Sequence, residues 1–398
     1  MNAIIENPIC VNDIGVWFYW NKKGKDFYVV GSKSVDKYFI VDQQKKEVIK
    51  YAIGLMDGKN SAIDINEKIK EEFQVDLDIN DLMTSLKKAG LLENHSNEKS
   101  SELDVFAKTV LNINFKPMVE RRRKFLSWLW NILFLLSIGT IIAAIATIIL
   151  KNNEFATFLK NSFKYKDSYL LGAILTSIAS IINIALHECA HAITSVRFGL
   201  QPSNFGVKIY GGFKLLWLVK INGMYTVERY KRIAIMISGI YMNFLLICVS
   251  AVICLWAPIS GITYDILSKV MLNNVFMILA CSMPFNISDG YYVVSQMAKR
   301  ANMRKKMFQI LNFKKNSFRN VDIWDVMYAL TSTAMLAYSF YLTGIWCYKI
   351  ILELSSTISI LTENTAVHYI LIAIPVLLIV WFYYIFIRRF FKLIKANA

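Results

Sequence analysis

The sequence predicts an α-helical, polytopic membrane protein of about six spans, preceded by a small N-terminal α+β domain with a winged-helix-like fold. Hydrophobic residues make up 55% of the 398 residues, more than a soluble chain of this size carries. Their distribution is uneven. Residues 1–115 mix apolar and charged side chains, whereas from Phe125 onward long apolar runs alternate with basic loops. We therefore expect one domain outside the bilayer and one domain that crosses it.

The apolar runs are long enough to cross a hydrocarbon core of about 30 Å. The predicted spans are Phe125–Leu150, Tyr169–Ala192, Ile233–Pro258, Ile266–Met283 with a continuation past a break to Met297, Trp324–Leu352 and Val367–Ile387. The positive-inside rule places residues 121–124, the basic 299–319 loop and the C-terminal tail in the cytoplasm. Residues 1–10 lack the features of a signal peptide. We therefore expect a multi-pass protein of a bacterial-type cell membrane with both termini in the cytoplasm.

The net charge of +16 would by itself suggest a nucleic-acid partner. The lysines and arginines are, however, concentrated beside the apolar spans, where they set membrane topology. We therefore expect the lipid bilayer as a partner and no nucleic acid. The six cysteines are scattered and form no CxxC pair, so no disulfide framework is expected.

The N-terminal domain is expected over residues 1–95. β-branched and aromatic runs separated by turn residues predict three strands, at 16–20, 27–30 and 38–41. Amphipathic patterns predict three helices after them, at 46–56, 63–73 and 79–89. Ser61 or Asp64 is expected to cap the second helix. Three strands followed by three short helices indicate the winged-helix-like fold.

The remaining boundaries follow from composition. A polar, turn-rich stretch predicts a linker and juxtamembrane segment over 96–120, in which the amphipathic residues 105–119 are expected at the membrane surface. A core over 121–300 precedes a basic loop and two C-terminal spans over 301–398. Residues 205–217 carry strand-like side chains around a Gly-Gly turn, and two interpretations stay open. They form either a hairpin that dips into the membrane or an ordinary amphipathic loop.

The most informative motif is His187-Glu188-Cys189-Ala190-His191, at the end of the second apolar run. Polar side chains at such a position are costly to desolvate, so they need a partner or a purpose. Histidines at i and i+4 lie on one helical face and can ligate one zinc ion, while Glu188 can act as a general base. The motif therefore predicts a catalytic zinc site at the end of a membrane span.

A catalytic zinc ion usually has three protein ligands and needs a third residue here. The candidates in or near the spans are Asp289, Glu228, Asp265 and His368. Asp289 is favoured because Pro284 breaks the helix and Gly290 lets the backbone turn, which can aim a carboxylate into the bundle. Topology also places Asp289 at a depth similar to that of His187, and places the last two candidates on the opposite side.

The HExxH motif in a span, followed by Asp289-Gly290, resembles the site-2 protease family of intramembrane zinc metalloproteases. The Asp-Gly-Tyr-Tyr form resembles the bacterial peptide zinc metalloprotease branch in particular. The resemblance covers roughly residues 120–300. It implies that His187, His191 and Asp289 hold one Zn²⁺ and that Glu188 is the general base.

Two further features bear on this resemblance. Gly239 and Asn243, as Gly-x-x-x-Asn, are similar to the family's Gly-Pro-x-x-Asn in the third span. The family usually has an Asn before the Pro of its Asp-Gly segment, whereas this chain has Cys-Ser-Met at 281–283. Any grip of that Asn on the substrate backbone would then fall to Asn286 or Asn243.

Residues 35–93 are similar to the small PqqD-like domains that recognise leader peptides of ribosomally made, modified peptides. The resemblance rests on a hydrophobic template that begins Val48-Ile49-x-x-Ala52-Ile53-x-Leu55-Met56-Asp57-Gly58. It implies that a peptide adds as a strand to the exposed sheet edge, in a groove lined by Tyr38–Val41 and Asn80–Lys87. A domain that only scaffolds the protein or binds nucleic acid is the alternative.

These patterns predict a zinc metalloendopeptidase that captures a precursor or leader peptide and matures it, with a peptide-modifying enzyme or an exporter as a further partner. Two alternatives stay open. One is regulated intramembrane proteolysis of a membrane signalling protein. The other is an inactive, peptide-binding export or immunity component that retains zinc for structure.

Overall fold

The structure is a computed structural model that describes residues 7–75, 77–93, 107–210, 214–282, 288–300, 303–312, 321–361 and 365–396. The chain divides into two compact units. The first contains Met1–Trp130 and His191–Ile235, and the second contains Asn131–Ala190 and Met236–Ala398. Three long helices cross this division and contribute to both units.

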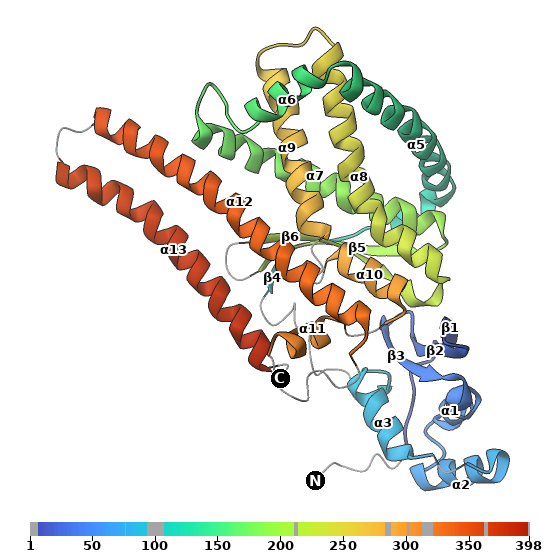
Figure 1. Cartoon of the computed structure of the whole chain (residues 1–398). Helices are drawn as coiled ribbons and strands as arrows, with labels where there is room; N and C mark the ends of the chain where they lie inside the picture. The colour runs from blue at the N-terminus through green and yellow to red at the C-terminus, as the bar shows by residue number, and fades with distance from the viewer. Residues whose placement is uncertain are drawn as a thin grey trace. The chain divides into compact units, whose positions relative to one another are not determined.

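The N-terminal domain has the predicted order of elements (Figure 1). An antiparallel sheet of order β1-β2-β3 is built from β1 (Ile14–Lys22), β2 (Lys25–Ser32) and β3 (Lys37–Asp42). The helices are α1 (Gln43–Leu55), α2 (Ala62–Phe73) and α3 (Ile79–Lys88). Ser61 caps α2 in a capping box with Asp64, so both predicted residues act together.

The core of this domain lies between the sheet and the three helices. Ile65 and Ile69 of α2 and Leu86 of α3 are fully buried, as their helical spacing predicts. The chain before β1 closes the domain, because the backbone of Cys10 bridges that of Leu92. The two ends of the domain are therefore held together.

A second antiparallel sheet belongs to the same unit. It has the order β4-β5-β6, with β4 (Ala107–Asn114), β5 (Gln201–Tyr210) and β6 (Lys214–Asn222). Two interpretations were open for residues 205–217, and the structure has strands there, since β5 and β6 pair antiparallel. Residues 211–213, between the two strands, lie outside the described residues. Residues 105–119 were expected to form an amphipathic segment at the membrane surface, but residues 107–114 form strand β4. Its register with β5 runs from Ala107 opposite Tyr210 to Asn114 opposite Asn204.

The first β-sheet is tied to the chain just before α8 (Arg229–Trp256). Gly223 donates its backbone N–H to Asp36 over 3.1 Å, and burial raises the pKa of that carboxyl. Arg232 of α8 is fully buried. Its guanidinium donates to the carbonyl oxygens of Tyr19 and Val227 over 2.7 and 2.8 Å and lies 4.6 Å from the Tyr19 ring centroid. The start of α8 is thus anchored to strand β1.

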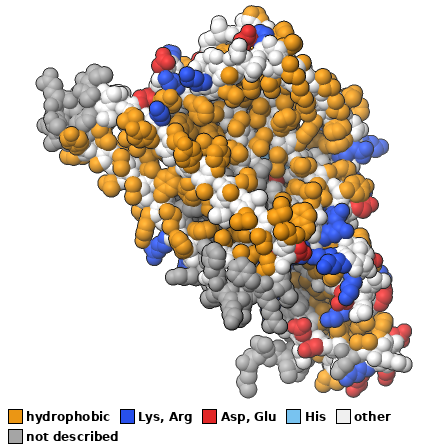
Figure 2. Space-filling view, in the orientation of Figure 1, with side chains coloured by type: hydrophobic (Ala, Val, Ile, Leu, Met, Phe, Trp, Pro, Cys, Tyr) orange, Lys and Arg blue, Asp and Glu red, His pale blue; other side chains and the backbone are white. Residues whose placement is uncertain are grey.

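Six helices of the described residues are long and apolar enough to cross a membrane, which confirms all six predicted spans. They are α5 (Lys116–Leu150), α7 (Tyr169–Arg197), α8, α9 (Ile262–Ser282), α12 (Ile323–Leu361) and α13 (Thr365–Ala396). Hydrophobic side chains cover much of the visible surface (Figure 2). The chain is therefore a multi-pass membrane protein.

Among the described residues of the second unit, three short helices lie between the spans. They are α6 (Asn152–Asn161), α10 (Asp289–Ala298) and α11 (Met303–Leu311). The last two spans, α12 and α13, pack against each other, and α11 packs against both (Figure 1). Helix α9 ends at Ser282 and α10 begins at Asp289. The break predicted at Pro284 falls within residues 283–287, which lie outside the described part of the chain.

Helix α7 is fixed at its first turn by a residue from α12. The carboxylate of Glu353 accepts hydrogen bonds from the backbone N–H groups of Tyr169 and Leu170, the latter over 3.2 Å, and from the Ser168 hydroxyl. The first N–H groups of a helix have no partner within the helix, and a negative charge there is favoured by the helix dipole. Glu353 therefore caps the span that carries the histidine motif.

Candidate metal centre

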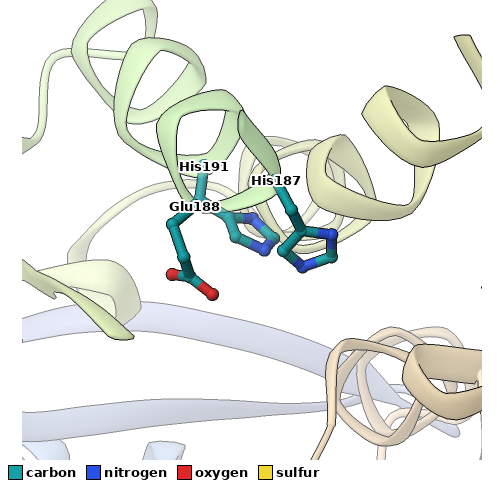
Figure 3. Close-up of side chains that lie close together, drawn as sticks. All are labelled: His187, Glu188 and His191. Carbon is teal, nitrogen blue, oxygen red and sulfur yellow. The ribbon is translucent and has the colours of Figure 1, made fainter. Parts of the chain in front are cut away.

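The histidine motif lies in α7, where His187, Glu188 and His191 occupy adjacent positions on one side of the helix (Figure 3). One donor atom from each residue lies within 4.8 Å of the others. His187 is 4% exposed and His191 is 8% exposed, while Glu188 is half-buried. Figure 3 shows the two imidazole rings side by side with the carboxylate next to them. One helical turn thus gathers two nitrogen donors and one carboxylate.

A backbone carbonyl sets the tautomer of His191. Its Nδ1 lies 2.7 Å from the carbonyl oxygen of Ile235 in α8. A carbonyl oxygen can only accept, so Nδ1 carries the proton and Nε2 keeps its lone pair. Metal-ligating histidines are usually held in this way, with the second ring nitrogen donating to a carbonyl or carboxylate. His191 is therefore prepared to ligate a metal through Nε2.

Asp289 is brought to the motif from the first turn of α10. Its Oδ2 lies 3.0 Å from Nε2 of His187, and its side chain is 24% exposed. Ligand atoms of a tetrahedral zinc ion are separated by about 3.3 Å when metal–ligand distances are about 2.0–2.1 Å. A small outward movement would therefore admit the ion. Imidazole nitrogens with a carboxylate oxygen are also a donor set that zinc prefers.

The structure adds one residue that the sequence analysis did not place at the site. Cys281, in the last turn of α9, offers a sulfur within 4.8 Å of donor atoms of His187 and Asp289. In the sequence, Cys281 stands only as the first residue of the Cys-Ser-Met run at 281–283, which by itself suggests no ligand. Its spacing of eight residues from Asp289 is the one signal in the sequence that could have suggested the juxtaposition.

The other candidate ligands do not join these groups. Among the described residues, neither Glu228 nor Asp265 belongs to a metal-like group with the histidines. Glu228 forms an ion pair with Lys231 and is exposed. The side chain of His368, and all of Asn286, lie outside the described residues. Asp289 is thus the sequence candidate that the fold brings to His187.

The two supporting residues in α8 are both buried. Gly239 and Asn243 follow Ile235 at i+4 and i+8, so they continue up roughly the same side of the helix. The side-chain amide of Asn243 is fully buried, and neither its nitrogen nor its oxygen has a hydrogen-bond partner among the described residues. A buried amide in this state is costly and is normally satisfied by water or by a bound group.

Polar contacts fix the two helices that carry the carboxylate and the first histidine. One turn before His187, Asn183 donates from its side-chain amide to the Asn273 side chain of α9 over 2.8 Å. At the far end of α10, Arg300 forms an ion pair with the buried Asp325 of α12 over 2.6 Å. Buried charges paired in this way are strongly orienting, because breaking the pair leaves one charge uncompensated.

The fold and the site define a class: a multi-pass membrane protein with paired histidines and a glutamate in one span, next to an aspartate of a following helix. No protein-family model, curated protein or solved structure matches the chain. The sequence placed His187, Glu188, His191 and Asp289 in one site, and the structure brings the first three, and separately His187 and Asp289, within reach of one another.

Proposed function

We propose that this chain is a zinc-dependent endopeptidase of the bacterial cytoplasmic membrane. The observation that carries the proposal is the histidine motif of α7 combined with the carboxylate of Asp289, 3.0 Å from His187. Three ligands leave a position for a water or a substrate carbonyl, as catalytic zinc sites require. A general base, Glu188, lies beside the same histidines.

The chemistry divides between the ion and the side chains. Zinc, when bound by His187, His191 and Asp289, would supply a Lewis acid that acidifies water and polarises the scissile carbonyl. Glu188 takes the proton of the attacking water and returns it to the leaving amine. The carbonyl of Ile235 holds the His191 ring in place during this cycle. The unsatisfied amide of Asn243 is suited to bind a peptide group of the substrate.

The substrate is proposed to be a ribosomally made precursor peptide that the N-terminal domain captures from the cytoplasm. In the described residues β3 pairs with β2 alone, so its outer edge is open to a further strand. Ile40, on β3, is 40% exposed and offers an apolar contact to such a strand. Holding the leader on the same chain would raise the local concentration of the cleavage site near α7.

The proposal is tested by trapping. The full chain with Glu188→Gln is expressed in its native host membranes, crosslinked, purified and analysed for bound peptides by mass spectrometry. Each captured species is then added to wild-type protein in lipid vesicles, with and without a zinc chelator. Capture of a short soluble precursor that zinc-loaded wild type cleaves supports the proposal. Capture of a transmembrane protein instead supports regulated intramembrane proteolysis, and failure to cleave any captured species refutes an endopeptidase.

Removal of either His191 or Asp289, two of the three proposed zinc ligands, is expected to remove the metal. We expect His191→Ala and Asp289→Ala to lower the zinc content of purified protein from about one ion per chain to near zero after dialysis against a mild chelator. Asp265→Ala, which changes an acidic residue of another helix, is the matched control and should keep its zinc. The measurement is elemental analysis. Full zinc occupancy in both variants would contradict the ligand assignment.

A further inference from the structure

The end of α9 presents a sulfur donor to the candidate zinc ligands. Cys281 is half-buried, and its Sγ lies within 4.8 Å of a nitrogen of His187 and a carboxylate oxygen of Asp289. Cysteine sulfur is among the strongest protein ligands for zinc, at about 2.3 Å. The sulfur, the nitrogen and the oxygen are therefore close enough to bind one small cation together after small side-chain movements.

The packing of α9 on α7 explains this position. Asn183 of α7 donates to the backbone carbonyl of Val270 as well as to Asn273. Val270 and Cys281 are eleven residues apart, or about three turns, and therefore share one side of α9. His187 follows Asn183 by one turn on α7. The contact made by Asn183 thus directs the side of α9 that ends in Cys281 toward the side of α7 that carries His187.

We propose that Cys281 is a fourth zinc ligand and that the resting centre is closed. This inference rests on the proposed function, because it assumes that zinc is held by His187, His191 and Asp289. Four protein ligands are typical of structural zinc sites, whereas catalytic sites keep one position for water or substrate. Cys281 therefore occupies the position that the reaction needs, and it must leave before a peptide bond can be cleaved.

A zinc centre closed by Cys281 would be opened by its substrate. A closed centre would not hydrolyse peptides that reach the membrane by chance, and the substrate would gain access by displacing one sulfur ligand. Replacing Cys281 should therefore weaken zinc binding, by about 10-fold to 100-fold or more, since even outer-shell changes at zinc sites have effects of that size. The same change should raise the cleavage rate per bound zinc in the absence of a leader peptide.

X-ray absorption spectroscopy at the zinc edge tests the ligand directly. We expect wild-type protein in lipid vesicles to show one sulfur scatterer at about 2.3 Å and nitrogen or oxygen scatterers at about 2.0–2.1 Å. Cys281→Ser and Cys281→Ala should lose the sulfur signal. Cobalt-substituted protein gives a second readout, because a cobalt–sulfur bond produces a charge-transfer band in the near ultraviolet that the same variants should lack.

Cys189→Ser is the matched control, because Cys189 lies inside the histidine motif yet belongs to neither donor group. It should keep both signals. A sulfur signal that survives in Cys281→Ala but disappears in Cys189→Ser overturns the inference, and so does wild-type zinc with nitrogen and oxygen ligands alone, which leaves the proposed function standing. Wild-type protein that binds no zinc overturns both. If the Cys281 variants do not fold, the wild-type and Cys189→Ser spectra still decide.

Discussion

Replacing Glu188 with Gln is expected to lower the rate constant for peptide cleavage by about 10²- to 10⁴-fold, the range that a positioned general base contributes. The amide of Gln keeps the size of the side chain but cannot accept the proton of water. Because Glu188 is not one of the three proposed ligands, the variant should retain its zinc. The cleavage rate is measured under single-turnover conditions in vesicles, with elemental analysis of the same sample.

The change needs a control that removes a carboxylate without touching the motif. Glu228 is suitable, because it is exposed and its ion pair with Lys231 lies outside the two donor groups. Glu228→Gln should cleave at the wild-type rate. Wild-type cleavage by Glu188→Gln would assign the base to another residue. Loss of zinc from the variant would show that Glu188 is a ligand instead.

Removal of the Arg232 side chain is expected to be the most destabilising single change in the first unit. In Arg232→Leu, the carbonyl oxygens of Tyr19 and Val227 lose charged donors in a fully buried place. Each unsatisfied carbonyl costs about 1–3 kcal/mol, so the loss for the two is about 2–6 kcal/mol. The thermal unfolding midpoint should therefore fall by several degrees. Zinc affinity should also fall, because Ile235, whose carbonyl binds the His191 ring, lies one turn beyond Arg232 in α8.

Lys231→Gln is the control for this change. Lys231 is the neighbouring residue, and its ion pair with Glu228 is exposed at the surface, where such pairs contribute little. It should unfold at the wild-type temperature. Arg232→Lys keeps the charge but cannot bridge two carbonyls with a planar fork, so an intermediate loss is expected. An Arg232→Leu protein as stable as wild type would contradict the anchoring role of this residue.

Most of the fold could be predicted because short stretches of sequence determine its helices and strands. Each span is a long, predominantly apolar run, and the three strands of the N-terminal sheet are β-branched and aromatic runs bounded by turn residues. The Ser61–Asp64 capping box is a four-residue pattern. Strand β4 was missed because its partner β5 lies about ninety residues further along the chain. A short segment of this kind becomes a strand only through that pairing.

Some residues of the candidate site could likewise be predicted from local sequence, and others could not. The helical period alone places His187 and His191 on one side of α7, and the Pro-Gly break identified Asp289. The carbonyl of Ile235 and the sulfur of Cys281 could not be predicted, because their positions depend on how α8 and α9 pack against α7. The periodicity of a single helix does not determine how that helix packs against its neighbours.

The cap that Glu353 provides for α7 defines how small a working fragment of this protein can be. A chain that ended before α12 would keep every proposed zinc ligand and the general base, yet the first turn of α7 would lose its acceptor for the N–H groups of Tyr169 and Leu170. The C-terminal helix pair is therefore part of what places His187. A shortened version of this protein should therefore retain α12 and α13.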